Sequence, residues 1–123
     1  MPTIPPFMLK QLYQRGSLRN TDTGWEFAMR NHLASATLVG LGLTCDGAGI
    51  PQEAVTVAQP AQDRTVPAAA LSAESPLQFP VQVPTIVRVT GSHLSPGSHT
   101  LSIIADTREI GPVTIAVQDD LAG

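Results

Sequence analysis

The sequence predicts an all-β fold, a single-domain β-sandwich of about seven to nine mostly antiparallel strands. Short segments alternate apolar and polar residues with period two, which is the pattern of a half-buried strand. Turn-forming Gly, Pro and Asp residues separate these segments at the short intervals typical of a sandwich, and no segment keeps a helical period. The 123 residues correspond to about one domain, which is long enough to bury a single core.

The expected elements follow in order along the chain. Residues 1–8 should form an extended, proline-rich arm, residues 9–118 the sandwich domain, and residues 119–123 a C-terminal tail. Strands are expected at 8–14, 25–30, 37–45, 54–58, 85–90, 101–105 and 112–118. The segment 77–83 alternates too, but Pro80 cannot donate to a ladder, so this segment is an edge strand or an extended connection. Residues 59–76 are the least ordered stretch by composition.

Two of these strands carry specific predictions about the core. In 25–30, alternation places Trp25, Phe27 and Met29 on the face that should pack inward. In 37–45, it places Val39, Leu41, Leu43 and Cys45 on one face and Leu38, Gly40, Gly42 and Thr44 on the other. The two glycines leave a flat strip that another backbone or a partner could approach closely. A turn at 46–49 ends this strand.

Composition limits the classes of function. The formal net charge is −3 and the single Lys and six Arg residues are dispersed, so no nucleic-acid partner is expected. The longest apolar-rich run, 33–45, is too short to span a bilayer, so no membrane partner is expected either. The N-terminus lacks the charged and apolar regions of a signal peptide, and the lone Cys45 indicates a reducing compartment. We therefore expect a cytoplasmic protein.

Few side chains could perform chemistry. His93 and His99 flank a Pro-Gly turn and could join His32 or Cys45 in a zinc site, or supply the general base of a small enzyme. Their spacing carries no metal-binding signature, so the favoured interpretation is loop histidines that are solvated or bonded to the turn backbone. No catalytic residue, metal ligand or cofactor is therefore predicted in this chain.

Other reactive or aromatic residues have structural interpretations. The alternation of Cys45 with apolar residues predicts a buried, inert thiol rather than a nucleophile. Trp25 with Phe27 could stack on a sugar, but aromatic residues make up only 4% of the chain, and core packing is favoured. Asp119 and Asp120 would point to opposite faces of a strand and are expected at a solvated terminus.

The order of several short motifs resembles a known family. Gly16-Ser17-Leu18-Arg19-Asn20 and Gly24-Trp25-Glu26-Phe27 come first, followed by Cys45-Asp46-Gly47 and Ile50-Pro51-Gln52-Glu53, and then by Leu94-Ser95-Pro96-Gly97-Ser98-His99. This pattern spans most of the chain, roughly 9–117, and resembles the small β subunit of bacterial C-glycoside deglycosidases.

The resemblance implies a non-catalytic β subunit that stabilises a larger α subunit and shapes its active-site entrance. The α subunit would resemble sugar isomerases, with a TIM barrel and a divalent metal, expected to be manganese, and the complex would be a lyase for the C–C bond of a 3-oxo-glycoside. The residues expected at the subunit interface are Phe7, Tyr13, Arg15, Arg19, Arg30, His93 and His99. The alternative is a free-standing β-sandwich that binds a carbohydrate or a protein, for example by strand addition.

Overall fold

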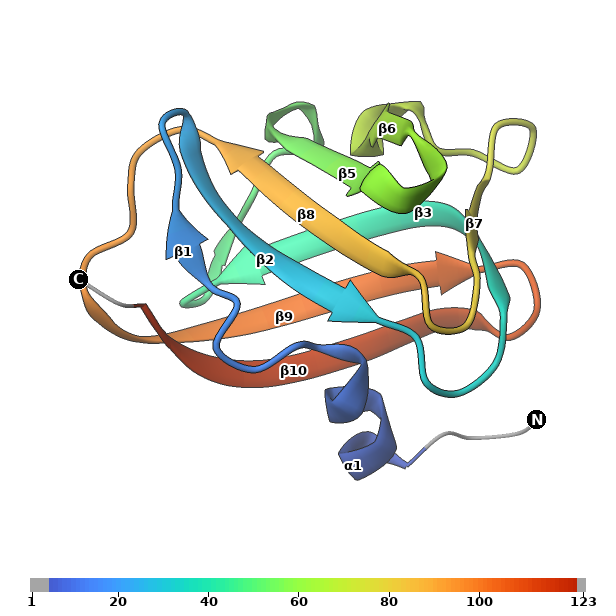
Figure 1. Ribbon diagram of the computed structural model, residues 1–123, viewed down its shortest axis with the longest axis horizontal. Coiled ribbons are helices and arrows are strands. Elements are labelled where there is room, and N and C mark those ends of the chain that lie inside the picture. Colours follow the sequence, from blue (N-terminus) through green and yellow to red (C-terminus); the bar gives the residue numbers. More distant parts are fainter. Residues whose placement is uncertain (1–4, 122–123) are drawn as a thin grey trace.

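The computed structural model describes residues 5–121 as two antiparallel β-sheets packed face to face (Figure 1). One sheet has the order β1 (Arg19–Asn20), β2 (Gly24–Arg30), β8 (Pro84–Thr90), β5 (Val55–Gln59) and β6 (Arg64–Pro67). The other has the order β10 (Gly111–Leu121), β9 (Gly97–Thr107), β3 (Ala36–Cys45) and β4 (Ala48–Gly49), with β7 (Leu77–Phe79) also paired to β3. The predicted all-β sandwich is confirmed.

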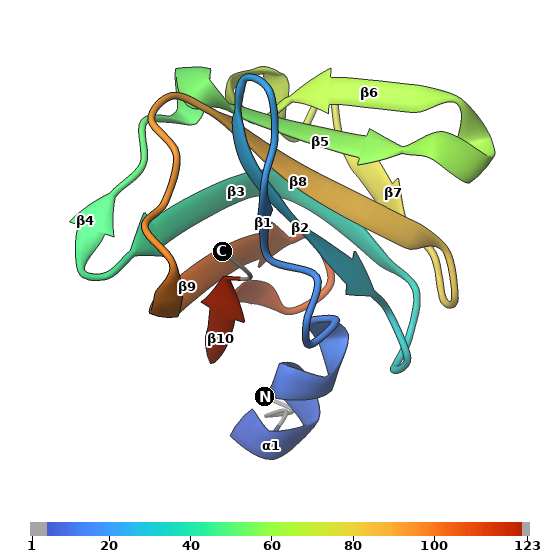
Figure 2. The same ribbon diagram turned by 60° about the vertical axis from the view of Figure 1, so that its left-hand side comes forward.

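The N-terminal segment differs from the prediction. Instead of a strand at 8–14, a helical turn α1 (Pro6–Leu9) continues into the 3₁₀ turn η1 (Lys10–Leu12). The helical spacing puts Leu9 and Leu12 on one side, where both are buried. Figure 2 shows α1 at the side where the sheets diverge, and η1 contacts both β10 and β2 there. Burial of these two leucines therefore overrides the local strand pattern, while residues 1–4 of the expected arm lie outside the described residues.

The core lies between the sheets. Trp25, Phe27 and Met29 are at most 4% exposed, as predicted, and Ile103 and Ile115 of the opposite sheet belong to the same buried cluster. The rings of Trp25 and Phe27 stack with centroids 6.3 Å apart. Large aromatic rings supply much of the buried area in such cores, which confirms core packing for both residues.

A β-bulge corrects the predicted faces of β3. The register with β9 shifts between Leu38 and Gly40, so Val39 is an extra residue in the ladder. As a result Leu38 and Leu41 both face the core, at 4% and 5% exposure, although strict alternation placed them on opposite faces. Gly40 and Gly42 stay on the outer face, beside Asp106 and Ile104.

The remaining differences concern the ends of strands. β10 pairs with β9 as far as Leu121, so Asp119 and Asp120 belong to a strand rather than to a solvated tail; residues 122–123 lie outside the described part. β7 pairs only with β3, as expected for an edge strand followed by Pro80. The stretch expected to be least ordered contains β6 and the 3₁₀ turns η3 (Pro60–Gln62) and η4 (Ala68–Ala70), and a further turn, η2 (Gln52–Ala54), precedes β5.

Within residues 5–121, no helix has the length and apolar character needed to cross a membrane. The described helices are single turns of three or four residues.

Candidate functional site

A tight hairpin turn places the first functional group. Asp46 and Gly47 have φ values of 52° and 83°, and Cys45 pairs with Ala48 across them, which is the geometry of a two-residue hairpin built on Asp-Gly. The turn holds Asp46 against β9. The Thr100 amide donates to Asp46 Oδ1 at 2.8 Å, and the Asp46 amide donates to the Thr100 carbonyl at 2.8 Å.

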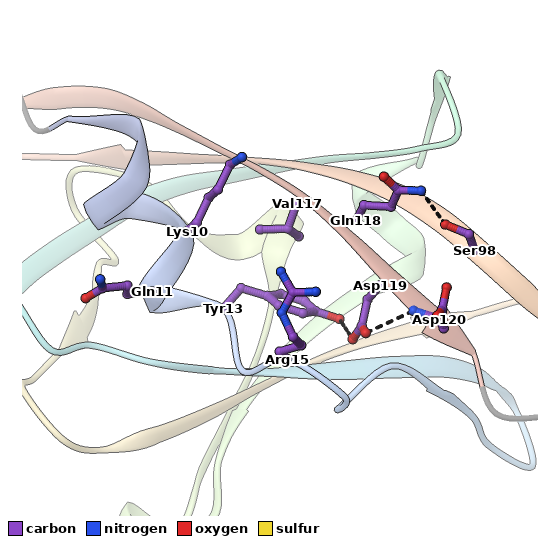
Figure 3. A pocket seen from close by; sticks show the side chains of 9 residues that line it. All are labelled: Lys10, Gln11, Tyr13, Arg15, Ser98, Val117, Gln118, Asp119 and Asp120. Atoms are coloured by element: carbon purple, nitrogen blue, oxygen red, sulfur yellow. Dashed lines mark hydrogen bonds between the residues drawn. The ribbon is translucent and has the colours of Figure 1, made fainter.

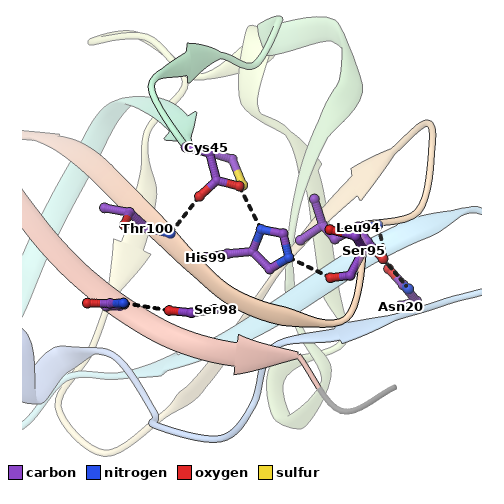
Figure 4. Close-up of polar contacts among 9 residues, drawn as sticks. Asn20, Cys45, Leu94, Ser95, Ser98, His99 and Thr100 are labelled. Atoms are coloured by element: carbon purple, nitrogen blue, oxygen red, sulfur yellow. Dashed lines mark hydrogen bonds and ion pairs between the residues drawn. The ribbon is translucent and has the colours of Figure 1, made fainter.

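His99 joins this turn in a polar cluster, which we call the His99 cluster (Cys45, Asp46 and His99). His99 Nδ1 lies 2.6 Å from Asp46 Oδ2. On the other side of the ring, Nε2 lies 2.6 Å from the Ser95 carbonyl oxygen, and Figure 4 shows this contact with both residues labelled. Both partners only accept hydrogen bonds, so both ring nitrogens must donate. The Ser95 carbonyl and the Asp46 carboxylate accordingly raise the pKa of His99. This geometry suits the imidazolium form of the ring, which donates from both nitrogens.

The same cluster fixes the protonation of its other members. Burial and the Asp46 charge raise the pKa of the Cys45 thiol to about 11, so the sulfur is a thiol at neutral pH and a poor nucleophile. The Thr100 amide and His99 lower the pKa of Asp46. His99 has no free lone pair with which to act as a general base, and the predicted burial of Cys45 is confirmed at 6% exposure.

The loop that precedes β9 is tied to its surroundings at several points. His93 Nε2 donates to the Thr21 carbonyl at 2.7 Å. The Asn20 side chain pairs with the backbone of Leu94, donating to its carbonyl at 3.0 Å and accepting from its amide at 2.9 Å. Both histidines thus bond backbone carbonyls, His93 that of Thr21 in a different turn and His99 that of Ser95, and His99 also bonds the Asp46 side chain.

A shallow cleft of about 340 Å³ borders the His99 cluster. Its walls come from the Cys45–Asp46 turn on one side and from the loop around His93 on the other. His32 does not join these groups, since its Nδ1 contacts Gln82 at 3.2 Å. Among residues 5–121, the group of ligand-type side chains that converges is Cys45, Asp46 and His99.

A second polar site lies along β10 (Figure 3). A groove of about 880 Å³ is lined by Lys10, Gln11, Tyr13, Arg15, Ser98, Val117, Gln118, Asp119 and Asp120. Tyr13 Oη donates to Asp119 Oδ2 at 2.7 Å, and the Gly16 amide donates to the same oxygen at 2.9 Å.

The Tyr13–Asp119 pair is buried, and its electrostatics follow from that. Desolvation opposes ionisation of Asp119, but the hydrogen bonds from Tyr13 and the Gly16 amide outweigh it, and its pKa is lowered. Burial and the neighbouring carboxylate raise the pKa of Tyr13. The pair therefore anchors the N-terminal segment on β10 and leaves neither group free to exchange protons near neutral pH.

An apolar hollow of about 260 Å³ lies at the opposite end of β9. We call it the apolar hollow; its lining residues are Leu9, Leu12, Asn31, Leu33, Ala34, Ser35, Ala36, Leu38, Phe79, Ala105, Thr107, Glu109, Ile110, Val113 and Ile115. The polar groups among them are occupied elsewhere. Glu109 accepts from the Thr37 amide and hydroxyl at 2.9 and 2.8 Å, and the Asn31 amide nitrogen donates to the carbonyls of Ala34 and Phe79.

The predicted interface residues have different environments. Phe7 on α1 is 67% exposed and Arg15 is exposed, whereas Tyr13 and His99 are only 6% exposed in this chain.

Arg19 forms a salt bridge with Glu26 on the neighbouring strand. Its Nε and Nη2 donate to Glu26 Oε2 at 3.0 and 2.8 Å, and Arg88 approaches the other carboxylate oxygen at 3.4 Å. The Nε atom of Arg30 has no hydrogen-bond partner among the described residues. None of these contacts tests the predicted interface, which stays a prediction.

Comparison with known proteins corrects the family suggested by the short motifs. Among curated proteins, none matches this sequence. The family model described as hydroxymethylglutaryl-CoA reductase, N-terminal domain, matches residues 8–122.

The resemblance to the β subunit of C-glycoside deglycosidases is therefore wrong, and of that description only the β-sandwich is supported. Its motifs were short turns, such as Asp46-Gly47, whose residues suit many hairpins. The α subunit, its manganese and the C–C bond cleavage that the resemblance implied stay untested. Since the match covers nearly the whole chain, this chain belongs to the family of hydroxymethylglutaryl-CoA reductase N-terminal domains.

Proposed function

We propose that this chain is a non-catalytic domain that binds another protein through the apolar hollow. The partner we propose is the catalytic part of the same enzyme, because the family is described as the N-terminal domain of a reductase. The free thiol of Cys45 supports a reducing, cytoplasmic location for such a complex.

The observation that carries the proposal is the apolar hollow itself. Its volume of about 260 Å³ is below the roughly 300–1,000 Å³ of pockets for drug-sized ligands. One large apolar side chain of a partner would fill such a space, and anchors of this kind dominate protein interfaces. Because the polar groups in its walls already have partners, an apolar group could enter without stripping hydrogen bonds.

The chemistry of the polar sites supports a non-catalytic role. His99 is an imidazolium with both nitrogens bonded, and Cys45 is a thiol. The Asp119 carboxylate is occupied by Tyr13 and the Gly16 amide. No free general base or activated nucleophile is found among these groups, which an enzyme of its own would need.

The carbohydrate alternative receives less support. Sugar binding relies on exposed aromatic rings, yet Trp25, Phe27 and Tyr13 are 3%, 1% and 6% exposed. The exposed ring that the described residues do offer is Phe7, and one ring alone makes a poor stacking platform. A protein partner is the better supported of the two alternatives.

A matched pair of charge substitutions tests the proposal. Ala34 lines the apolar hollow and Ala116 lies on the outer face of β10, and both are exposed. The protein that copurifies with the tagged chain from its native source would be identified by mass spectrometry and its affinity measured by titration calorimetry. We expect Ala34→Glu to weaken binding at least about tenfold, because the partner would bury an unpaired charge, and Ala116→Glu to leave it unchanged.

Equal affinities for the two variants would contradict binding through the apolar hollow. Turnover by the purified chain alone that is lost in His99→Gln would contradict the non-catalytic role. The two parts of the proposal therefore fail independently.

A further inference from the structure

The His99 cluster gathers three kinds of metal ligand that the proposed function does not use. An imidazole nitrogen, a thiol sulfur and a carboxylate oxygen come from β9, from the end of β3 and from the turn after it. We propose that Cys45, Asp46 and His99 bind a divalent transition-metal ion, Zn²⁺ by preference, in the place of the proton between His99 and Asp46.

The donor atoms are close enough for one ion. All three lie within 4.8 Å of one another, and Cys45 Sγ is 3.8 Å from Asp46 Oδ2. Ligands of a tetrahedral Zn²⁺ are about 3.4–3.7 Å apart, from the usual metal–ligand lengths. The 2.6 Å between His99 Nδ1 and Asp46 Oδ2 must therefore widen by about 0.8 Å to admit the ion.

The Asp46 side chain can supply that movement. Its side chain is 49% exposed, and its other oxygen, Oδ1, is held by the Thr100 amide. A small rotation about this anchor moves Oδ2 away from the ring while keeping the anchoring hydrogen bond. Neither β3 nor β9 needs to shift.

The orientation of His99 gives independent support from outside the cluster. Nε2 donates to the Ser95 carbonyl at 2.6 Å (Figure 4), and a histidine that binds a metal usually donates its other nitrogen to such an acceptor. This bond fixes the ring so that Nδ1 points at Asp46. An electrophile must lie between that nitrogen and the carboxylate, and either a proton or a metal ion meets the requirement.

The charge balance also favours exchange of protons for the ion. The cluster without metal carries an imidazolium, a carboxylate and a thiol, with a net charge of zero. Binding Zn²⁺ releases the Nδ1 proton of His99 and the thiol proton of Cys45 to solvent, and the occupied cluster is again neutral. No oxidant or reductant takes part in this step.

The surroundings allow entry and favour a borderline-soft ion. The cleft of about 340 Å³ reaches Cys45 and Asp46 from outside, and it leaves room for water as a fourth ligand. A ligand set of sulfur, nitrogen and oxygen suits Zn²⁺ and does not suit Mg²⁺ or Ca²⁺, which prefer oxygen alone.

Several titratable groups face His99 and will shape the pH dependence of binding. Asp46 and Cys45 belong to the site, and Asp119 lies opposite His99 in the β9–β10 register, bonded to Tyr13. Because two protons leave, affinity should rise with pH until His99 and Cys45 no longer hold them. Asp119 has a lowered pKa and is held by Tyr13 and the Gly16 amide, so it is not a ligand of the site.

Titration with Co²⁺, followed by displacement with Zn²⁺, tests the site in the purified chain. Co²⁺ bound by Cys45 should show a sulfur-to-cobalt charge-transfer band and the visible bands of a four-coordinate ion, at one ion per chain, and Zn²⁺ should abolish both. We expect Cys45→Ser to lose the charge-transfer band and His99→Gln to weaken Co²⁺ binding at least tenfold. His93→Gln, in the loop that precedes β9, is the matched control and should bind as the unaltered chain does.

Asp46→Asn separates loss of the metal ligand from loss of folding. The amide oxygen of Asn can still accept the hydrogen bond from the Thr100 amide, while the anionic ligand is removed. This variant should remain folded by circular dichroism and bind Co²⁺ more weakly. Absence of a charge-transfer band at millimolar Co²⁺ would overturn the proposal. Equal binding by His99→Gln and the unaltered chain would overturn it as well.

Discussion

At one end of β9, His99 is held on both ring nitrogens by Asp46 and Ser95. At the other end, Thr107 borders an apolar hollow of about 260 Å³ whose walls are almost entirely carbon. The two positions are eight apart in the sequence, roughly 26 Å along an extended strand. One end is thus closed by hydrogen bonds between charged groups, while the other is left partly unfilled.

The difference separates stability from binding within one small sandwich. Charged hydrogen bonds are directional and hold the loop before β9 in one arrangement. An incompletely filled apolar space lacks that directionality, and its lining loses the dispersion contacts that an occupant would supply. Substitutions at the closed end should therefore affect the folded state of the free chain, and surface substitutions at the open end should affect association.

The largest effect is expected where the open end meets the core. Ile115 is 1% exposed and lines the apolar hollow, so Ile115→Ala should lower the free energy of unfolding by about 3 kcal/mol. Because the enlarged space stays dry, benzene should restore part of this loss. Denaturant unfolding with and without benzene measures both. Ile104→Ala, at a 41% exposed position on the outer face of β9, should lower the free energy of unfolding by no more than about 0.5 kcal/mol. A loss as large as that of Ile115→Ala would mean that burial beside the apolar hollow is not the cause of the effect.

A smaller loss is expected at the closed end. His99→Gln removes two charge-assisted hydrogen bonds and should lower the free energy of unfolding by about 2 kcal/mol near pH 6. His93→Gln, which alters a single exposed contact to Thr21, should lower it by less than about 0.5 kcal/mol. Urea unfolding of both variants decides the point. Equal losses in the two variants would mean that the hydrogen bonds of the His99 cluster do not stabilise this end of β9.

The contribution of His99 should also depend on pH. Its folded pKa is raised above the ordinary 6.5, so its stabilisation is complete below pH 6.5 and is lost as the pH rises through the folded pKa. Asp46 has a folded pKa below the ordinary 3.8, so its stabilisation is present above pH 3.8 and is lost as the pH falls through that lower value. The stability gap between the unaltered chain and His99→Gln should be widest between these limits. A gap that widens above pH 7 would have the wrong sign.

The smallest effect concerns the turn that carries Asp46. Gly47 has a φ of 83° in open space, so Gly47→Ala should cost about 1 kcal/mol through backbone strain alone. Gly49, also in open space, has no positive φ, and Gly49→Ala is the matched control, expected to be neutral or slightly stabilising. Thermal unfolding of the two variants compares them. Similar losses would mean that the turn conformation is not the source of the effect.

Local patterns predicted much of the fold. Period-two alternation identified the inward faces of β2 and β10, and Asp46-Gly47 identified its turn. The missed features depend on the rest of the molecule. The α1–η1 segment is helical because Leu9 and Leu12 are buried between the diverging sheets. The bulge at Val39 turns Leu38 to the core side, whereas Leu41, Leu43 and Cys45 keep the face that alternation assigned.

The polar sites could not be predicted from the sequence, because the residues that form each site are far apart along the chain. His99 and Asp46 are 53 positions apart, and Tyr13 and Asp119 are 106 positions apart. A single sequence shows which residue types are present, but it does not show which of these residues contact one another in the fold. The sequence marks His99 as a candidate site residue and Asp46 as a turn residue, and the β3–β9 pairing brings the two together.

The bond from Tyr13 to Asp119 also bears on how the chain folds during synthesis. Tyr13 and the Gly16 amide have their acceptor on the last strand, 106 and 103 positions later. The N-terminal segment can pair with β2 early, through the bridge between Tyr13 and Met29, but it cannot bond to Asp119 until residue 119 has left the ribosome. The gap between the diverging sheets is therefore covered only in part until β10 is in place. Contacts of such long range slow folding. The nascent chain must pass through a stage with apolar surface exposed, during which chaperones would have their best opportunity to bind it.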